Sequence, residues 1–202
     1  MTKLINIRKI SSESKITKYI TDVPEMMGDN RQYKFVISTS DIDTSFDVVD
    51  QGGWELAMYL ANPTVLWSHN SEQLPIGRCV SIGVEDGKLK ATVEFATTEC
   101  NPLAEQVYQS VKGGFISATS VGFMPVEWEE TTDSERGGGT YSAGFDYKKN
   151  ILREFSLCNV PANQYALIEP GQRADSTPTN INNIKMARER RLKILALRGR
   201  IR

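Results

Sequence analysis

The segment GRCVSIGVEDGKLKATVEFA, residues 77–96, decides the fold class of this chain. Two runs that alternate apolar and polar side chains flank Asp86-Gly87, a pair that favours the two-residue turn of a β-hairpin. We therefore expect two antiparallel strands here. The same alternation predicts further strands at QYKFVIST (32–39), TVLWSH (64–69), FISATSVGFMPVEWEE (115–130) and ILREFSLCNVP (151–161).

Two short helices are expected between these strands. WELAMYLANP (54–63) stops before Pro63, and NPLAEQVYQSVKGG (101–114) has Asn101 as its N-cap and Pro102 at its first helical position. The segments DIDTSFDVVDQGG (41–53) and the polar, Gly-rich 131–149 are typical of loops. Short hairpins with few crossovers predict an α+β fold, in which a mostly antiparallel sheet curls into a β-barrel with short helices around it.

Composition indicates a globular protein without a membrane segment. The chain has 202 residues, 40% hydrophobic and 24% charged, enough for one sizeable core. No apolar run approaches the roughly 18–20 residues that span a bilayer, and the N-terminus lacks a signal-peptide core, so we expect a cytosolic protein at synthesis. Cys79, Cys100 and Cys158 are far apart and form no CxxC pair. Neither disulfides, nor a zinc site, nor any other cofactor is expected.

Charge divides the chain into a body and a tail. Residues 185–202 hold eight Lys or Arg and one Glu, a net charge of +7, which leaves −8 for residues 1–184 because the whole chain carries −1. We expect a leader (1–30), a globular domain (31–170), a linker (171–183) and a basic tail (184–202). Such a tail favours an acidic partner or nucleic acid, although a solvated helix that aids solubility explains it equally well.

Three residue types that can support nucleophilic catalysis occur in the order His, Ser, acid. His69 is the only histidine, at the end of an expected strand, and Ser117 and Ser120 lie in a strand of small residues. Glu154 lies beside an apolar run. A serine hydroxyl needs a base to take its proton, and a carboxylate can orient that base. Each residue alone fits a structural role as well, and sequence order does not show that they meet.

Three blocks of the sequence resemble one known family. NPTVLWSHNSEQLPIGR is similar to the NP-x-VLW-x-H…PIGR block of the tailed-phage prohead proteases, which are capsid-maturation serine peptidases distantly related to herpesvirus assemblin. GGFISATSVGF resembles the Gly-rich lead of that family into SxGF, and LREFSLCNVPANQYA resembles its E-x-S-L…PAN block. The resemblance covers about residues 33–168 in family order. It implies a barrel like that of the herpesvirus proteases.

The resemblance assigns roles residue by residue. His69 matches the catalytic histidine, and Ser120, in SVGF, matches the nucleophile. Glu154 matches the acid of the last block, with Asp146 and Glu127 as alternatives. The Gly-rich excursion at 131–149 departs from the family pattern. The sequence also shows no long scaffold segment after the protease domain, so we expect any scaffolding to come from another chain or from a longer precursor of which this chain is a part.

The resemblance therefore implies a serine endopeptidase within the assembling procapsid, in the host cytoplasm. Its expected substrates are the scaffold segment, the extension of the major capsid protein and the protease itself, and a homo-oligomer is consistent with the family. Backbone N–H groups, Arg78 or Arg153 would stabilise the oxyanion. Two alternatives stay open: a catalytically idle, scaffold-like procapsid component of the same fold, and a nucleic-acid-binding protein that acts through its basic tail. The acidic body argues against the second, because it lacks a basic and aromatic stripe.

Overall fold

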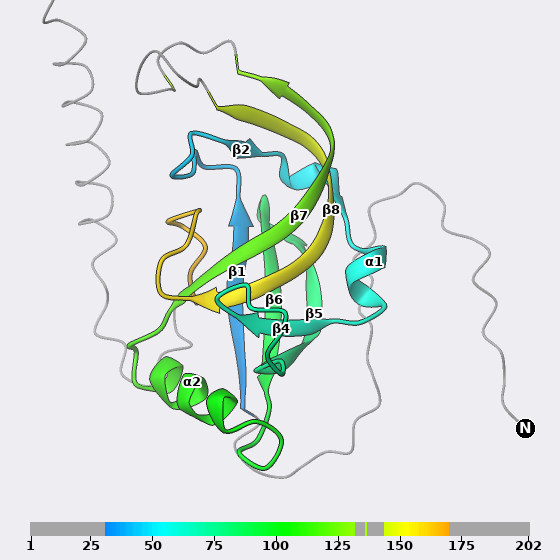
Figure 1. Ribbon diagram of the computed structural model, residues 1–202. Helices are drawn as coiled ribbons and strands as arrows, with labels where there is room; N and C mark the ends of the chain where they lie inside the picture. The colour runs from blue at the N-terminus through cyan, green and yellow to red at the C-terminus, as the bar shows by residue number, and fades with distance from the viewer. Residues whose placement is uncertain (1–30, 132–135, 137–143, 170–202) are drawn as a thin grey trace, which may run out of the picture.

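The computed structural model describes residues 31–131, 136 and 144–169, and its centre is a strongly curved sheet (Figure 1). The expected hairpin is present as β5 (Gly77–Glu85) and β6 (Lys88–Phe95). Asp86 and Gly87 form its turn with φ of 53° and 69°, the conformation that Asp-Gly sequences favour. β1 (Gln32–Thr39) pairs antiparallel with β6, with the bounds that its alternation predicts. The expectations for these strands are confirmed.

The other half of the sheet is organised around one long strand, β8 (Phe145–Cys158). β7 (Ala118–Glu130) pairs antiparallel with one edge of β8, and β4 (Thr64–Trp67) pairs with it in parallel. Two short strands, β2 (Val48–Val49) and β3 (Trp54–Glu55), also pair in parallel with β8. The sheet order is β1-β6-β5-β4-β8-β2, with β3 and β7 also on β8.

Residues 166–169 connect the two open edges of this sheet. On one side Val36 N–H donates to Leu167 O at 2.9 Å, and on the other Thr119 N–H donates to Ala166 O at 2.9 Å. The segment therefore lies between β1 and the start of β7, and it closes the sheet into a barrel. The expected class, a mostly β fold curled into a barrel with short helices around it, is confirmed.

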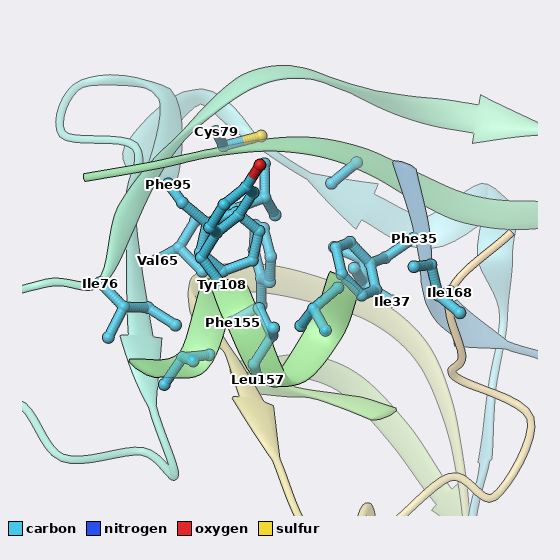
Figure 2. Packing of buried hydrophobic residues seen from close by; sticks show 14 of the residues in the cluster. Phe35, Ile37, Val65, Ile76, Cys79, Phe95, Tyr108, Phe155, Leu157 and Ile168 are labelled. Carbon is cyan, nitrogen blue, oxygen red and sulfur yellow. The ribbon is translucent and has the colours of Figure 1, made fainter. Parts of the chain in front are cut away.

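One helix covers an end of the barrel. α2 (Pro102–Lys112) begins as expected: Asn101 Oδ1 accepts a hydrogen bond from Leu103 N–H at 3.0 Å. Its buried residues recur at helical spacing and face the sheet, namely Ala104, Val107, Tyr108 and Val111. Figure 2 shows Tyr108 among the core side chains, and its ring centroid lies 5.7 Å from that of Phe95. This helix has 11 residues, and no helix in the described ranges is long and apolar enough to cross a bilayer.

Several expected boundaries are wrong. The helix expected over 54–63 is only α1 (Ala57–Leu60), because Trp54 and Glu55 pair with β8 as β3. The expected loop at 41–53 contains β2 and a 3-10 turn, η1 (Gln51–Gly53). The strand expected over 115–130 begins at Ala118. The strand expected over 64–69 ends at Trp67.

The strand expected over 151–161 instead runs from Phe145 to Cys158, so the end of the expected loop at 131–149 is strand. Its polar alternating residues are held by pairing with β7 and with the short parallel strands. Of the expected excursion, residues 132–135 and 137–143 lie outside the described part, as do the leader, the linker and the basic tail.

Candidate active site

The chain turns sharply where β4 ends, and this turn carries the histidine. Ser68 and His69 have φ of 51° and 60°, in the left-handed region that residues with a Cβ seldom adopt. Such a conformation costs about 1 kcal/mol or more per residue and is often found at functional sites. The turn is held because Ser68 N–H donates to Leu157 O at 2.9 Å and Asn70 N–H donates to Trp67 O at 3.1 Å.

This turn changes the face on which the His69 side chain lies. Val65 is buried in the core, and an unbroken strand would send the side chain of His69 to that same face. On the neighbouring β8, Phe155 and Leu157 are core residues, so Glu154 and Ser156 point to the opposite face. The left-handed turn therefore brings His69 from the core face to the face that holds Glu154.

His69 and Glu154 are in direct contact there. Nδ1 of His69 lies 2.6 Å from Oε1 of Glu154, although the two residues are 85 positions apart in the sequence. The side chains are 42% and 23% exposed, so the pair lies at the surface with the carboxylate more enclosed. The hydrogen bond that His69 donates to Glu154 is the main cause that raises the pKa of His69 above its ordinary value of 6.5, and partial burial opposes this rise.

A fully buried serine joins both members of this pair. Ser156 Oγ donates to the second carboxylate oxygen of Glu154, Oε2, at 2.9 Å. Ser156 Oγ also accepts a hydrogen bond from the backbone N–H of His69 at 3.0 Å. The carboxylate is thus bound at both oxygens, and the histidine backbone is attached to the strand that carries it.

The absence of a side chain at one glycine provides the space that the Glu154 carboxylate occupies. Gly122 lies opposite Glu154 in the pairing of β7 with β8. A Cβ on Gly122 would lie 2.2 Å from Glu154 Oε1, the oxygen that contacts His69. Any larger residue at this position would have to displace the carboxylate, so glycine is required for the observed contact.

Strand register places Ser120 beside this group. Ser120 on β7 lies directly opposite Ser156 on β8, so the two side chains share a face, with Cβ atoms about 4.5–5.5 Å apart. Ser120 is 7% exposed. Within the described part, its hydroxyl makes no hydrogen bond to His69. Contacts of this kind are commonly long in unliganded enzymes and tighten when substrate binds.

Ser117 differs from Ser120 in position and environment. It precedes β7 by one residue, and its carbonyl accepts a hydrogen bond from Ile168 N–H at 2.7 Å in the barrel closure. The expectation that both serines lie within one strand is therefore wrong for Ser117.

The other acids and basic residues singled out in the sequence lie elsewhere or are engaged. Asp146 binds Arg136 at 2.5 Å near the opposite end of β8, and Glu127 lies opposite Lys149 further along the same pair of strands. Arg78 is paired with Glu94 at 2.7 Å. Arg153, by contrast, is exposed and directly precedes Glu154.

Arg153 is also the extra residue in a bulge of β8. The register moves from Glu154 opposite Gly122 to Leu152 opposite Phe123 and leaves Arg153 without a partner residue on β7. Because of this bulge, Leu152 and Phe155 both face the core although they are three residues apart. The apolar alternation expected over 151–161 therefore fails at its start, where Leu152 rather than Ile151 is fully buried.

The buried thiols are poor alternative nucleophiles. Burial raises the pKa of Cys79 to about 12, and it also raises the pKa of Cys158 above its ordinary value. Both therefore remain protonated near neutral pH. In the described ranges, no group of three or more His, Cys, Asp or Glu side chains is arranged to hold a metal ion.

Comparison with known proteins gives a family match and a distant relative. Residues 29–180 match the family described as Caudovirus prohead serine protease. A capsid polyprotein of Pseudomonas phage PAJU2 is 24% identical over 151 residues, which is 73% of this chain and 21% of that polyprotein. The chain therefore spans about a fifth of the length of this relative.

Proposed function

The chain belongs to the Caudovirus prohead serine protease family, and from this premise we propose that it is a serine endopeptidase that uses His69, Ser120 and Glu154. The observation that carries the proposal is the 2.6 Å contact between His69 Nδ1 and Glu154 Oε1, on the face of the sheet that Ser120 shares. A base held by a carboxylate beside a serine is the arrangement that activates a hydroxyl for acyl transfer.

In the proposed reaction Glu154 accepts the Nδ1–H of His69, which leaves Nε2 free to accept a proton. His69 Nε2 takes the proton of Ser120 as its oxygen attacks the substrate carbonyl carbon. The imidazolium then gives this proton to the leaving amine, and an acyl-enzyme remains. Water, deprotonated by the same imidazole, then attacks the acyl carbon. The ester bond to Ser120 Oγ breaks, the imidazolium returns its proton to that oxygen, and the acid is released. The negative charge of Glu154 stabilises the imidazolium in both steps.

The oxyanion that forms in each step needs donors fixed in advance. Backbone N–H groups near Ser120 and the guanidinium of Arg153 are the candidates that we retain. Arg153 is exposed beside Glu154, whereas Arg78 is engaged with Glu94 at 2.7 Å. Of the two arginines singled out in the sequence, Arg153 is therefore the better placed.

We propose the scaffold segment, the extension of the major capsid protein and the protease itself as substrates, inside the assembling procapsid in the host cytoplasm. The family description and the name of the relative, a capsid polyprotein, support this assignment. Co-expression with the capsid protein of the same phage tests it. Wild type should shorten that protein and Ser120→Ala should not, whereas equal capsid processing by both would exclude this chain as the protease.

Labelling with a fluorophosphonate tests the chemistry directly, since the probe modifies only an activated serine. The purified full chain should be labelled once, and mass spectrometry of the digested protein should place the adduct on Ser120. Ser120→Ala should abolish the labelling, while Ser117→Ala, the matched control, should retain most of it. An adduct lost only in Ser117→Ala would reverse the assignment of the nucleophile.

An idle, scaffold-like component of the same fold is the second candidate. It is favoured by one observation: in the described residues the Ser120 hydroxyl makes no hydrogen bond to His69. A wild-type chain that takes up no fluorophosphonate, although it is folded, would support this candidate over the peptidase.

A further inference from the structure

Ser156 makes contacts that packing alone does not require. It is fully buried, and its oxygen lies between two groups of the proposed catalytic site: the Glu154 carboxylate at 2.9 Å and the His69 backbone N–H at 3.0 Å. Other serines of the chain satisfy their hydroxyls locally. Ser110, which is partly buried, donates to the carbonyl of Gln106, one turn earlier in its own helix, at 2.8 Å.

The chemistry of a hydroxyl fixes the direction of both bonds. A serine has a single O–H donor, and its lone pairs accept. Because the His69 N–H can only donate to Ser156 Oγ, the one proton of the hydroxyl is free to point at Glu154 Oε2. The hydrogen bond from that proton therefore occupies Oε2 and leaves Oε1 to accept from His69 Nδ1.

We infer that Ser156 is a positioning residue that sets the His69–Glu154 pair. Through one oxygen it fixes the rotation of the Glu154 carboxylate and attaches the left-handed turn at His69 to β8. The inference rests on the proposed function for its catalytic consequence. Its geometric part, the setting of His69 by Ser156 through Glu154, stands apart from whether the chain cleaves peptides.

The single histidine makes this inference measurable without an activity assay. In the full chain, labelled with ¹⁵N and purified without a polyhistidine tag, NMR of the imidazole reports on His69 alone. The wild type should show a His69 pKa above the ordinary 6.5 and the tautomer with its proton on Nδ1. Ser156→Ala should lower the His69 pKa toward 6.5 and mix the tautomers, because the carboxylate is no longer held at Oε2.

The sign of that change separates two roles for Ser156. If Ser156 acted only by withdrawing charge from the carboxylate, its removal would strengthen the interaction of Glu154 with His69 and raise the pKa of His69. A His69 pKa that stays constant or rises in Ser156→Ala would overturn the inference. Tyr59 and Cys158 also interact electrostatically with Glu154, but burial raises the pKa of each, so both stay neutral over the titration.

A double-mutant comparison tests whether Ser156 acts through Glu154. In a Glu154→Gln background, the further change Ser156→Ala should leave the His69 pKa where Glu154→Gln alone has set it. An equal fall in both backgrounds would mean that Ser156 sets the His69 pKa without the Glu154 carboxylate, and would contradict the inference that it acts through Glu154. Ser81→Ala is the matched control, because Ser81 also donates from a strand to a neighbouring side chain, Thr92 Oγ1, at 2.9 Å.

The fluorophosphonate labelling rate of the same variants gives the catalytic consequence. Ser156→Ala should slow labelling about 10- to 100-fold, the scale of one hydrogen bond to a charged group, while Ser81→Ala keeps the wild-type rate. If Ser156→Ala does not fold, Ser156→Cys keeps a weaker donor in the site and should shift the His69 pKa in the same direction. An unlabelled wild type would count against the proposed function, whereas the NMR result would still decide the role of Ser156.

Discussion

Gly122→Ala should damage the site without unfolding the protein. The new Cβ would lie 2.2 Å from Glu154 Oε1, and a tolerable contact begins near 3.0 Å. The carboxylate oxygen must therefore retreat by about 0.8 Å or more, the difference between these two distances, and it is the oxygen that contacts His69 Nδ1 at 2.6 Å. A displacement of about 1 Å in a catalytic group can reduce the rate about 100-fold, which corresponds to about 2.7 kcal/mol of transition-state stabilisation.

The free energy of unfolding should change much less. Replacing a strand glycine by alanine gains roughly 0.5–1 kcal/mol from the unfolded chain, and this offsets part of the overpacking. The Glu154 side chain is 23% exposed, so it can swing toward solvent instead of straining the strand. We expect the stability of Gly122→Ala to lie within about 1 kcal/mol of wild type by urea denaturation.

The assay compares fluorophosphonate labelling rates with those of a matched variant. Gly83→Ala on β5 is that control, because a Cβ on Gly83 meets nothing within 4 Å. Labelling should fall about 100-fold in Gly122→Ala and stay unchanged in Gly83→Ala. A folded Gly122→Ala protein that is labelled at the wild-type rate would refute the argument that this glycine makes room for the carboxylate.

Four further predictions concern the site, the helix cap and the tail. The fluorophosphonate labelling rate should rise with pH as His69 loses its proton, with the midpoint of the pH profile above 6.5. Glu154→Gln should shift this midpoint to lower pH and reduce the maximal labelling rate. The pKa of His69 is raised in the folded protein, so its pair with Glu154 should add to the free energy of unfolding below about pH 6.5. This contribution should be lost as the pH rises through the folded pKa. Urea denaturation of wild type and Glu154→Gln at several pH values would check this. Asn101→Ala should lower the free energy of unfolding by about 1–3 kcal/mol, measured by the same method. The substitution removes the N-cap of α2 and both hydrogen bonds from Asn101 Nδ2 to the carbonyls of Leu74 and Pro75. A loss under about 0.5 kcal/mol would contradict this prediction. Deletion of 184–202 should leave the melting temperature and peptide cleavage nearly unchanged but reduce incorporation into procapsids, and a large fall in melting temperature would show that the tail belongs to the core.

Local signals in the sequence predict the local parts of the fold. The turn at Asp86-Gly87 and the capped helix α2 are each specified by residues close together in the sequence, and both occur where expected. The short parallel strands are different, because β2 and β3 are each two residues long and exist only by pairing with β8, about a hundred positions later. Such pairing depends on tertiary contacts rather than on intrinsic propensity.

The residues of the candidate site also differ in how well the sequence predicts them. His69, Ser120 and Glu154 are noticed because their chemistry is distinctive and the resemblance orders them. The turn that reorients His69 gives no such signal, since neither residue with positive φ is a glycine. Ser156 is the serine of the E-x-S-L block, but it receives no role from the sequence, because a serine in a strand is unremarkable. Its spacing of two from Glu154 indicates only that the two share a face.

The closure of the barrel by residues 166–169 bears on when the site takes shape during synthesis. Thr119, the neighbour of Ser120, donates its backbone N–H to Ala166 and its side-chain hydroxyl to Val36 O at 2.9 Å. Of these three residues, Val36 is synthesised first and Ala166 last. Contacts between residues so far apart in the sequence form late and slowly. A nascent chain that has not yet emerged through residue 169 therefore lacks the last support of the Ser120 strand. Translation itself delays the completed site until the domain is almost entirely outside the ribosome.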